Sequence, residues 1–236
     1  MSWLPRFFLL LTVSLVIGCR EPDRVEARDY DSFWLWAGVK PAEALKSARA
    51  IYILDGEVRG EPPRFVPLRA AAPRTHGPDV WLVIRTDTLG WPPTAIEALG
   101  QRADAWARAG NNVAGVQLDF DARTRHLREY GQFLREVRRS LPARYKLSIT
   151  GLMDWSANGD PDALLQLKGV VDEVVIQTYQ GRATIFGYER YFERMRSFPI
   201  AFKVGLVEHG RWIEPAGLRN ERNFKGYVVF LLPSKR

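Results

Sequence analysis

The sequence predicts an α/β fold and, within that class, a compact (β/α)8 TIM-type barrel. Eight apolar segments of strand length recur along the 236 residues, and helical patterns lie between most of them. Mostly apolar strands that alternate with helices are typical of a parallel sheet covered by helices, and eight repeats favour closure into a barrel. An open doubly wound sheet is the alternative, but "AGVKPAEA" after the first segment lacks the glycine-rich dinucleotide-binding fingerprint.

The predicted strands are short runs rich in β-branched and aromatic residues that end in polar or turn-forming residues. They cover residues 32–38, 50–58, 80–87, 113–121, 145–155, 173–181, 202–210 and 226–233.

Two helices are predicted with clear start and stop signals. The first, over residues 93–110, opens with Pro93 and closes at Gly110. The second, over 124–142, carries a stripe of apolar side chains at helical spacing and stops at Pro142. Shorter amphipathic segments are expected at 161–171, 188–198, 41–48 and 215–224, whereas the proline-rich segment 59–78 predicts no helix.

The N-terminal segment is typical of a secretion signal. Arg6 precedes an apolar run from Phe7 to Ile17, which is shorter than the roughly 20 residues that span a bilayer. The run ends in Val-Ile-Gly-Cys and resembles the bacterial lipobox, which implies cleavage before Cys19 and lipidation of that cysteine. We therefore expect a signal peptide at 1–18, a charged tether at 19–29 and one barrel domain at 30–236.

Composition excludes several other classes of protein. Cys19 is the only cysteine, so a lipidated chain has no disulfide and no thiol chemistry. The net charge of +7 would suit nucleic acid, but export to the envelope argues against that partner. Arg20 follows the cysteine where an aspartate would resemble an inner-membrane retention signal. We expect a monomer at the periplasmic face of the outer membrane.

The fourth predicted strand alternates strictly between two faces. Its apolar face holds Val116, Leu118 and Phe120, and its polar face holds Gln117, Asp119 and Asp121. Active sites of (β/α)8 barrels lie at the C-terminal ends of the strands, so we expect the polar face to point into the barrel mouth. Other predicted strands also end in candidate ligand-binding residues, namely Trp36, Arg85, Asp87, Trp155, Gln177 and Tyr179.

The same strand resembles that of glycoside hydrolase family 18, the chitinase-like barrels. That family carries Asp-x-x-Asp-x-Asp-x-Glu, and its places fall here on Ala114, Gln117, Asp119 and Asp121. "QTYQ", with Gln177 and Tyr179, is similar to the family's Met-x-Tyr-Asp on the sixth strand, while the family's tryptophan on the last strand has no counterpart in "GYVVFLLP". The resemblance implies that Asp121 is the general acid, and that Asp119 and Tyr179 hold the acetamido group of the sugar.

A more extensive resemblance is to an uncharacterised bacterial family, the domain of unknown function 3142. It rests on "VQLDFDARTRHLREYGQFLREVRRSLP" followed by "LSITGL". This family is similar to glycoside hydrolases in fold, and its activity is unassigned.

These observations predict an envelope protein that binds an oligosaccharide and hydrolyses a glycosidic bond. Asp121 is one methylene shorter than the family's glutamate, which withdraws the carboxyl by about 1.5 Å, so a non-catalytic glycan-binding barrel or an envelope scaffold stays open. We expect no cofactor. Asp119 and Asp121 could ligate Ca2+ or Mg2+, but no other residue has ligand spacing, so we expect no metal.

Overall fold

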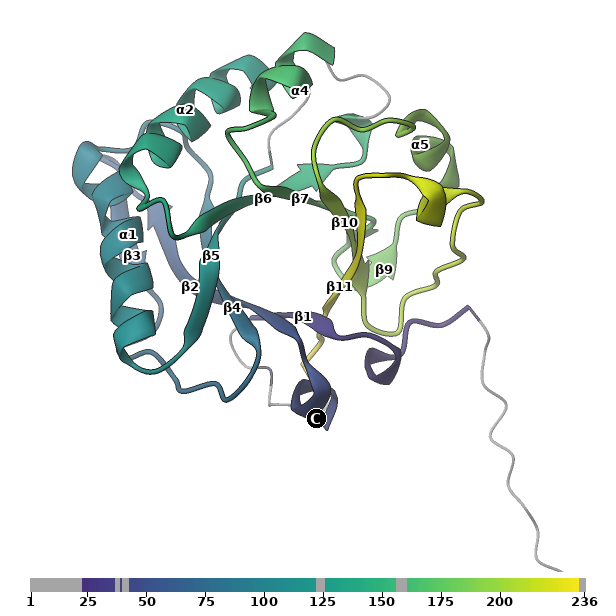
Figure 1. Cartoon of the computed structure of the whole chain (residues 1–236), viewed down its shortest axis with the longest axis horizontal. Helices are drawn as coiled ribbons and strands as arrows, with labels where there is room; N and C mark the ends of the chain where they lie inside the picture. The colour runs from purple at the N-terminus through teal and green to yellow at the C-terminus, as the bar shows by residue number, and fades with distance from the viewer. Residues whose placement is uncertain (1–22, 37–38, 40–42, 122–125, 156–160, 234–236) are drawn as a thin grey trace, which may run out of the picture.

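A computed structural model describes residues 23–36, 39, 43–121, 126–155 and 161–233. Eight parallel strands form a closed barrel, in the order β1-β11-β10-β7-β6-β5-β4-β2, and the pairing of β1 with β2 closes it (Figure 1). The predicted (β/α)8 fold is confirmed, with one strand in each predicted range. The strands are β1 Ser32–Leu35, β2 Ala50–Arg59, β4 Asp79–Thr86, β5 Asn112–Asp119, β6 Lys146–Leu152, β7 Glu173–Gln177, β10 Phe202–Val207 and β11 Phe224–Phe230.

Helices cover the outside of the barrel (Figure 1). The two predicted long helices are α1 Pro93–Arg108, which has proline at its first position, and α2 Leu127–Ser140. The shorter ones are α4 Pro161–Leu167, α5 Glu189–Arg194 and the 3-10 turns η1 Ala27–Asp29, η2 Glu43–Ser47 and η4 Leu218–Asn220.

Two departures from the simple strand–helix repeat lie beside the barrel. After β2 the chain forms β3 (Arg64–Pro67), which pairs antiparallel with β2. This strand takes the place of a helix in the proline-rich segment. After β7 the chain forms a small hairpin of β8 (Tyr179–Gln180) and β9 (Ala183–Thr184), which brings Tyr179 back over the end of the barrel.

The alternation predicted for β5 is confirmed by its burial. Val116 and Leu118 belong to the apolar layer between the sheet and the helices, together with Leu99 of α1 and Leu134 of α2. Gln117 and Asp119, on the other face, are also buried, because that face lines the interior of the barrel.

The barrel interior is filled by aromatic side chains. Trp34 of β1 contacts Tyr52 of β2 edge to face at 5.9 Å, and Tyr52 stacks on Trp81 of β4 at 5.5 Å. Gly205 of β10 makes room for this packing, because a Cβ there would lie 2.8 Å from the ring of Trp34.

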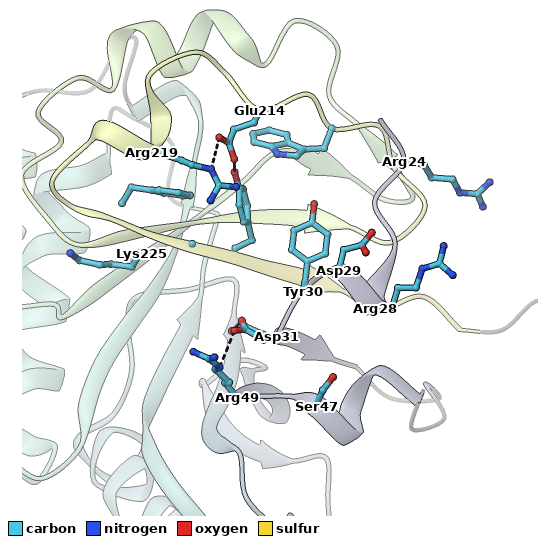
Figure 2. A pocket seen from close by; sticks show the side chains of 15 residues that line it. Arg24, Arg28, Asp29, Tyr30, Asp31, Ser47, Arg49, Glu214, Arg219 and Lys225 are labelled. Atoms are coloured by element: carbon cyan, nitrogen blue, oxygen red, sulfur yellow. Dashed lines mark hydrogen bonds and ion pairs between the residues drawn. The ribbon is translucent and has the colours of Figure 1, made fainter. Parts of the chain in front are cut away.

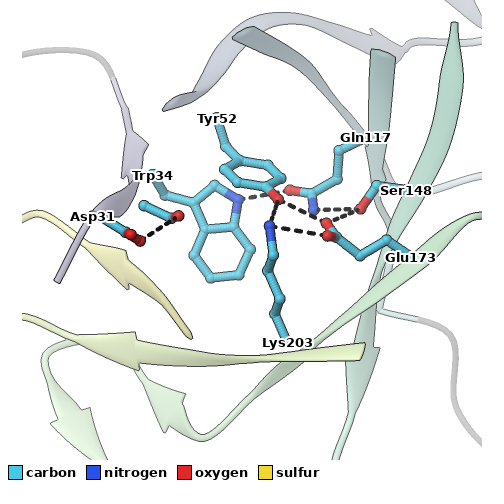
Figure 3. A network of polar contacts seen from close by, with 8 residues as sticks. Asp31, Trp34, Tyr52, Gln117, Ser148, Glu173 and Lys203 are labelled. Carbon is cyan, nitrogen blue, oxygen red and sulfur yellow. Dashed lines mark hydrogen bonds and ion pairs between the residues drawn. The ribbon is translucent and has the colours of Figure 1, made fainter. Parts of the chain in front are cut away.

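A chain of polar contacts crosses the same interior (Figure 3). Lys203 of β10 forms an ion pair with Glu173 of β7 at 3.0 Å, and its Nζ donates to the Tyr52 hydroxyl at 3.0 Å. Glu173 Oε1 accepts hydrogen bonds from the Tyr52 hydroxyl at 2.7 Å and from Ser148 Oγ at 3.3 Å. Such a network fixes the strands relative to each other because every buried polar group in it has a partner.

The network continues upward to the level of the predicted site. Gln117 Nε2 donates to Ser148 Oγ at 2.9 Å, and Trp34 Nε1 donates to Gln117 Oε1 at 2.6 Å. Gln117 therefore links Trp34 to the ion pair through Ser148.

No helix in the described residues is both long enough and apolar enough to cross a membrane. The predicted signal peptide and Cys19 lie outside the described residues.

Candidate functional site

A pocket of about 750 Å³ lies at the C-terminal end of the barrel, where the sequence places the candidate site. Its walls come from β4, β5, β6, β7 and β11 and from the β8–β9 hairpin. The lining residues are Trp36, Arg85, Thr86, Asp87, Asp119, Phe120, Asp121, Leu152, Gln177, Tyr179, Gln180, Gly181, Ile185 and Phe230.

The two predicted carboxylates share this pocket but have different surroundings. Asp119, the last residue of β5, is 9% exposed and accepts a hydrogen bond from Thr150 Oγ1 at 3.0 Å. Asp121 follows two residues later and is exposed. Asp121 lies beyond the end of β5, and it is close enough for its charge to raise the pKa of Asp119.

Burial raises the pKa of the Asp119 carboxyl from its ordinary value of 3.8. The hydrogen bond from Thr150 lowers the pKa of Asp119. The negative charge of Asp121 raises this pKa further, and the positive charge of Arg85 lowers it. A carboxylate in a partly dry site with a second carboxylate nearby retains its proton to higher pH. The shift falls on Asp119, whereas the family 18 resemblance gives the role of acid to Asp121.

The raised pKa predicts that Asp119→Asn stabilises the protein at neutral pH. Because the folded pKa lies above the unfolded value, the stability that Asp119 contributes is fully present below about pH 4 and is lost as the pH rises through the folded pKa. The stability that the variant gains over the wild-type chain should therefore be greater at pH 7 and vanish toward about pH 4. Urea unfolding at a series of pH values measures it, with Asp87→Asn as the control. A gain that is equal at every pH would contradict the prediction.

Aromatic rings form the opposite wall of the pocket. Trp36 contacts Phe230 edge to face at 5.5 Å, and Tyr179 stacks on Phe230 at 5.6 Å. The guanidinium of Arg85 lies 5.3 Å from the centre of the Trp36 ring and so covers one of its faces. Aromatic faces of this kind contact apolar surfaces of a ligand.

The Tyr179 hydroxyl is held in its neutral form. Burial raises the pKa of Tyr179 well above 10.0, and the charge of Asp119 raises it further, while the Gln177 side chain lowers it. A protonated hydroxyl is a hydrogen-bond donor, so Tyr179 is able to donate to an oxygen of a ligand.

The structure brings most of the predicted site residues together and leaves two outside. Trp36, Arg85, Asp87, Asp119, Asp121, Gln177 and Tyr179 all line the pocket. Gln117 and Trp155 do not, and this corrects their predicted place at the mouth.

The reason differs for the two residues that lie elsewhere. Gln117 lies on the face of β5 that points into the barrel, but it is two residues further from the mouth than Asp119. It is fully buried and forms hydrogen bonds with Trp34 and Ser148. Trp155 lies beyond the end of β6 and turns outward, where its ring contacts Tyr130 of α2 at 6.5 Å.

Asp55 of β2 is another polar residue near a strand end that does not reach the mouth. Its strand has an irregular register beside it, between Leu54 and Gly56, and its side chain turns outward to α1. There it is fully buried and accepts two hydrogen bonds from Arg102, at 2.6 and 2.8 Å, and one from Trp106 Nε1 at 3.0 Å.

Phe230 is the main pocket residue that sequence reasoning missed. It ends β11, in the run where the family's tryptophan has no counterpart, and it nevertheless contacts both Trp36 and Tyr179. The available signal was an aromatic residue at the C-terminal end of the last predicted strand.

Among the described residues, no group of three or more histidine, cysteine, aspartate or glutamate side chains is placed to hold a metal ion.

The fold is a (β/α)8 barrel with a pocket at the C-terminal ends of its strands. Residues 83–192 match the model of the family described as Domain of unknown function (DUF3142), which confirms the predicted resemblance to this family. In a search of curated proteins, the histidine–tRNA ligase of Micrococcus luteus is 30% identical over 112 residues, which are 47% of this chain and 23% of that protein. The chain therefore spans less than a quarter of that relative.

Solved structures confirm the likeness in fold. The spore cortex-lytic enzyme SleL of Bacillus cereus superposes with a TM-score of 0.53 at 19% identity, over 75% of this chain and 51% of that one. A chitinase from Bacteroides thetaiotaomicron superposes with a TM-score of 0.52 at 11% identity, over 75% of this chain and 67% of the chitinase chain. The xylanase and alpha-amylase inhibitor protein XAIP-II of Scadoxus multiflorus gives 0.52 at 10% identity, over 85% and 92%. The chain spans about half of the SleL structure.

Proposed function

We propose that the pocket at the C-terminal end of the barrel binds a glycan. The observation that carries the proposal is that three aromatic rings, of Trp36, Tyr179 and Phe230, and several carboxylates line one pocket of about 750 Å³. Sugars present apolar ring faces and polar edges, which match aromatic and carboxylate side chains respectively. The likeness to chitinases and to the cortex-lytic enzyme supports the same ligand class.

Glycan binding predicts that Trp36→Ala weakens affinity for oligosaccharides, because the variant removes the largest ring of the wall. We expect roughly a fivefold weaker Kd or more, since an aromatic contact contributes about 1 kcal/mol beyond the area it buries. Titration calorimetry of the full chain with chitin-type and envelope oligosaccharides measures it. Trp36→Tyr keeps a ring at the site and should keep most of the affinity. Equal affinities for the wild-type chain and the alanine variant would contradict this assignment.

We infer further that the pocket hydrolyses a glycosidic bond. Two carboxylates and a neutral tyrosine hydroxyl lie in the same pocket. Asp119 ends β5 and Asp121 follows it by two residues, so the two carboxylates do not flank a bond as a separate acid and nucleophile would.

A substrate-assisted reaction, as the family 18 resemblance implies, needs one protein acid. Asp121 donates its proton to the leaving oxygen. The acetamido oxygen of the sugar attacks the anomeric carbon as the bond from that carbon to the leaving oxygen breaks. Water then adds to the anomeric carbon and opens the ring, and the proton that the water loses returns to the Asp121 carboxylate. Asp119 orients the acetamido group and stabilises its positive charge, and Tyr179 holds the same group.

Hydrolysis predicts that Asp121→Asn abolishes cleavage and leaves binding intact. General acid catalysis contributes at least about a hundredfold, so the product should fall by that factor or more, as followed by mass spectrometry. Glu97→Gln removes an exposed carboxylate from α1, outside the pocket, and should cleave like the wild-type chain. Binding without cleavage in both the wild-type chain and Asp121→Asn would instead support a non-catalytic glycan-binding barrel. If the wild-type chain bound none of the oligosaccharides, the remaining hypothesis would be an envelope scaffold without a glycan ligand.

The location that we propose is the cell envelope, with the chain anchored by lipid on Cys19. The lipobox-like segment supports it. Mass spectrometry of the N-terminal peptide from the producing bacterium tests it, because cleavage before Cys19 and acylation each change the mass of that peptide.

A further inference from the structure

Two exposed apolar side chains lie on segments that follow the C-terminal ends of β7 and β10. Among the described residues, four large apolar side chains are exposed, and two of them are Phe186, at 97%, and Ile213, at 46%. Phe186 follows Ile185, which lines the candidate pocket, and Gly187 turns the chain after it with a φ of 73°. The turn therefore presents a whole phenyl ring to solvent next to a residue of the pocket wall.

Tyr188 holds the segments of these two residues together. Its hydroxyl accepts a hydrogen bond from the Ile213 amide at 2.6 Å and donates one to the Ile213 carbonyl at 2.8 Å. Its ring stacks on Trp212 at 4.7 Å. Phe186 and Ile213 thus belong to one part of the surface, which we call the apolar edge. Burial of a phenyl ring that water now surrounds is favourable, so this edge fits an apolar partner.

The N-terminal segment meets the apolar edge. The Trp212 amide donates to the Asp23 carbonyl at 2.7 Å, and the Val25 amide donates to the Gly210 carbonyl at 2.9 Å. From there the segment runs along the outside of the barrel to Asp31, just before β1, beside a pocket of about 780 Å³ (Figure 2). The first described residue, Asp23, therefore lies beyond the C-terminal end of β10 and not at the starts of the strands.

A lipid on Cys19 would bring the apolar edge to a bilayer. Cys19 lies four residues before Asp23, and four residues span at most about 14 Å even when fully extended. A tether this short limits which parts of the barrel are able to reach the membrane. The Asp23 carbonyl is bonded to Trp212, the residue before Ile213, so the apolar edge lies next to the tether.

The charged side chains where the tether meets the barrel are paired within the chain. Asp23 lies 3.4 Å from Arg211. Arg24 lies 3.2 Å from Glu26. The apolar side chains, and not these charges, are therefore the groups that an external partner would contact here.

We propose that the apolar edge inserts into the bilayer that holds the lipid of Cys19, with Phe186 as the main inserted side chain. This inference rests on the lipid anchoring proposed above. Aromatic and aliphatic side chains enter the boundary between headgroups and acyl chains, where their apolar surface leaves water. Docking places the mouth of the candidate glycan pocket beside the membrane, because Ile185 in its wall directly precedes Phe186.

The test is photolabelling of the full chain, with the processing that the cell gives it, in vesicles of phosphatidylcholine. The lipid carries a diazirine in its acyl chain, which forms a carbene on illumination and bonds to any part of the protein that enters the bilayer. Mass spectrometry of the digested chain locates the adducts. We expect them in residues 185–188 and 211–214, and not around Leu68 or Leu165, which are the other two exposed apolar side chains.

Matched variants assign the adducts to the apolar edge. Phe186→Ser with Ile213→Ser removes both of its exposed apolar side chains. The adducts in residues 185–188 and 211–214 should fall about tenfold, since burial of a phenyl ring favours the docked state by about that factor. Leu68→Ser with Leu165→Ser removes two apolar side chains from exposed positions elsewhere and should leave the adducts unchanged. Equal adducts in the two double variants would overturn the proposal.

Acylation of Cys19, measured in the same digest, separates failure of this inference from failure of the anchor. An acylated chain whose adducts are confined to residues 19–23 is anchored, and the docking proposal is overturned. Adducts at the apolar edge of a chain without acylation support docking and contradict the anchor. A chain with neither overturns both. A chain that is dimeric in analytical ultracentrifugation, and that Phe186→Ser makes monomeric, would assign the apolar edge to a second copy and overturn docking.

Discussion

Lys203→Met is expected to destabilise the barrel by about 3–5 kcal/mol, because it removes one partner of a buried ion pair. The side chains of Lys203 and Glu173 are only 15% and 11% exposed, and their nitrogen and oxygen atoms lie 3.0 Å apart. Without the lysine, Glu173 keeps the hydroxyl donors of Tyr52 and Ser148 but loses its compensating charge. The free energy of unfolding in urea, at unchanged denaturant dependence, measures the loss.

A second variant separates charge from packing. Lys203→Met combined with Glu173→Gln leaves no buried charge at this place, and the glutamine oxygen is still able to accept from Tyr52. We expect the double variant to recover much of the lost stability, since a buried pair and a neutral replacement often differ little. A double variant as unstable as Lys203→Met would show that packing of the lysine stem, and not the charge, carries the effect.

Asp55→Ala is expected to cost about 3–5 kcal/mol, because it leaves Arg102 and Trp106 with unpaired donors. Asp55 is 0% exposed, the Arg102 side chain is 22% exposed, and the contact is a two-pronged carboxylate–guanidinium pair. The pair ties β2 to α1, so we also expect α1 amides to exchange faster with solvent in the variant.

The control for Asp55→Ala is an ion pair of the same charges at the surface. Glu43 and Lys46 lie 2.7 Å apart and are 86% and 76% exposed. Such pairs contribute about 0–1 kcal/mol, so Glu43→Ala should leave the urea midpoint almost unchanged. A cost for Asp55→Ala as small as that of Glu43→Ala would contradict the role given to its burial.

The eight strands were predictable because most of them are apolar runs buried on both faces, and burial of that kind leaves a clear signal in the sequence. The alternation around Asp119 likewise predicted which face of β5 points inward. How far each inward side chain lies from the mouth was not predictable. Gln117 and Asp119 share a face, yet one is covered by Trp34 and the other lines the pocket.

Asp55 and Trp155 illustrate a second limit. A polar or aromatic residue near a strand end has two directions open to it, and local backbone geometry selects one. The register irregularity at Asp55 and the end of β6 before Trp155 turn both side chains outward, toward helices. The partners that they meet there, Arg102 and Tyr130, lie on helices whose rotation about their axes depends on the packed core.

The barrel closes only when β1 has paired with both of its neighbours, and one of these is the last strand of the chain. β1 pairs with β2, which follows it directly, and with β11, which is the last strand. Until β11 is present, β1 and β10 each expose an unpaired row of backbone amides and carbonyls, and such edges recruit other chains. Contacts between the two ends of a chain also form slowly. Chains cut short before β11 should therefore aggregate instead of forming a smaller stable barrel. Pairing of β11 with β1 and β10 removes the last unpaired strand edges and so prevents this aggregation.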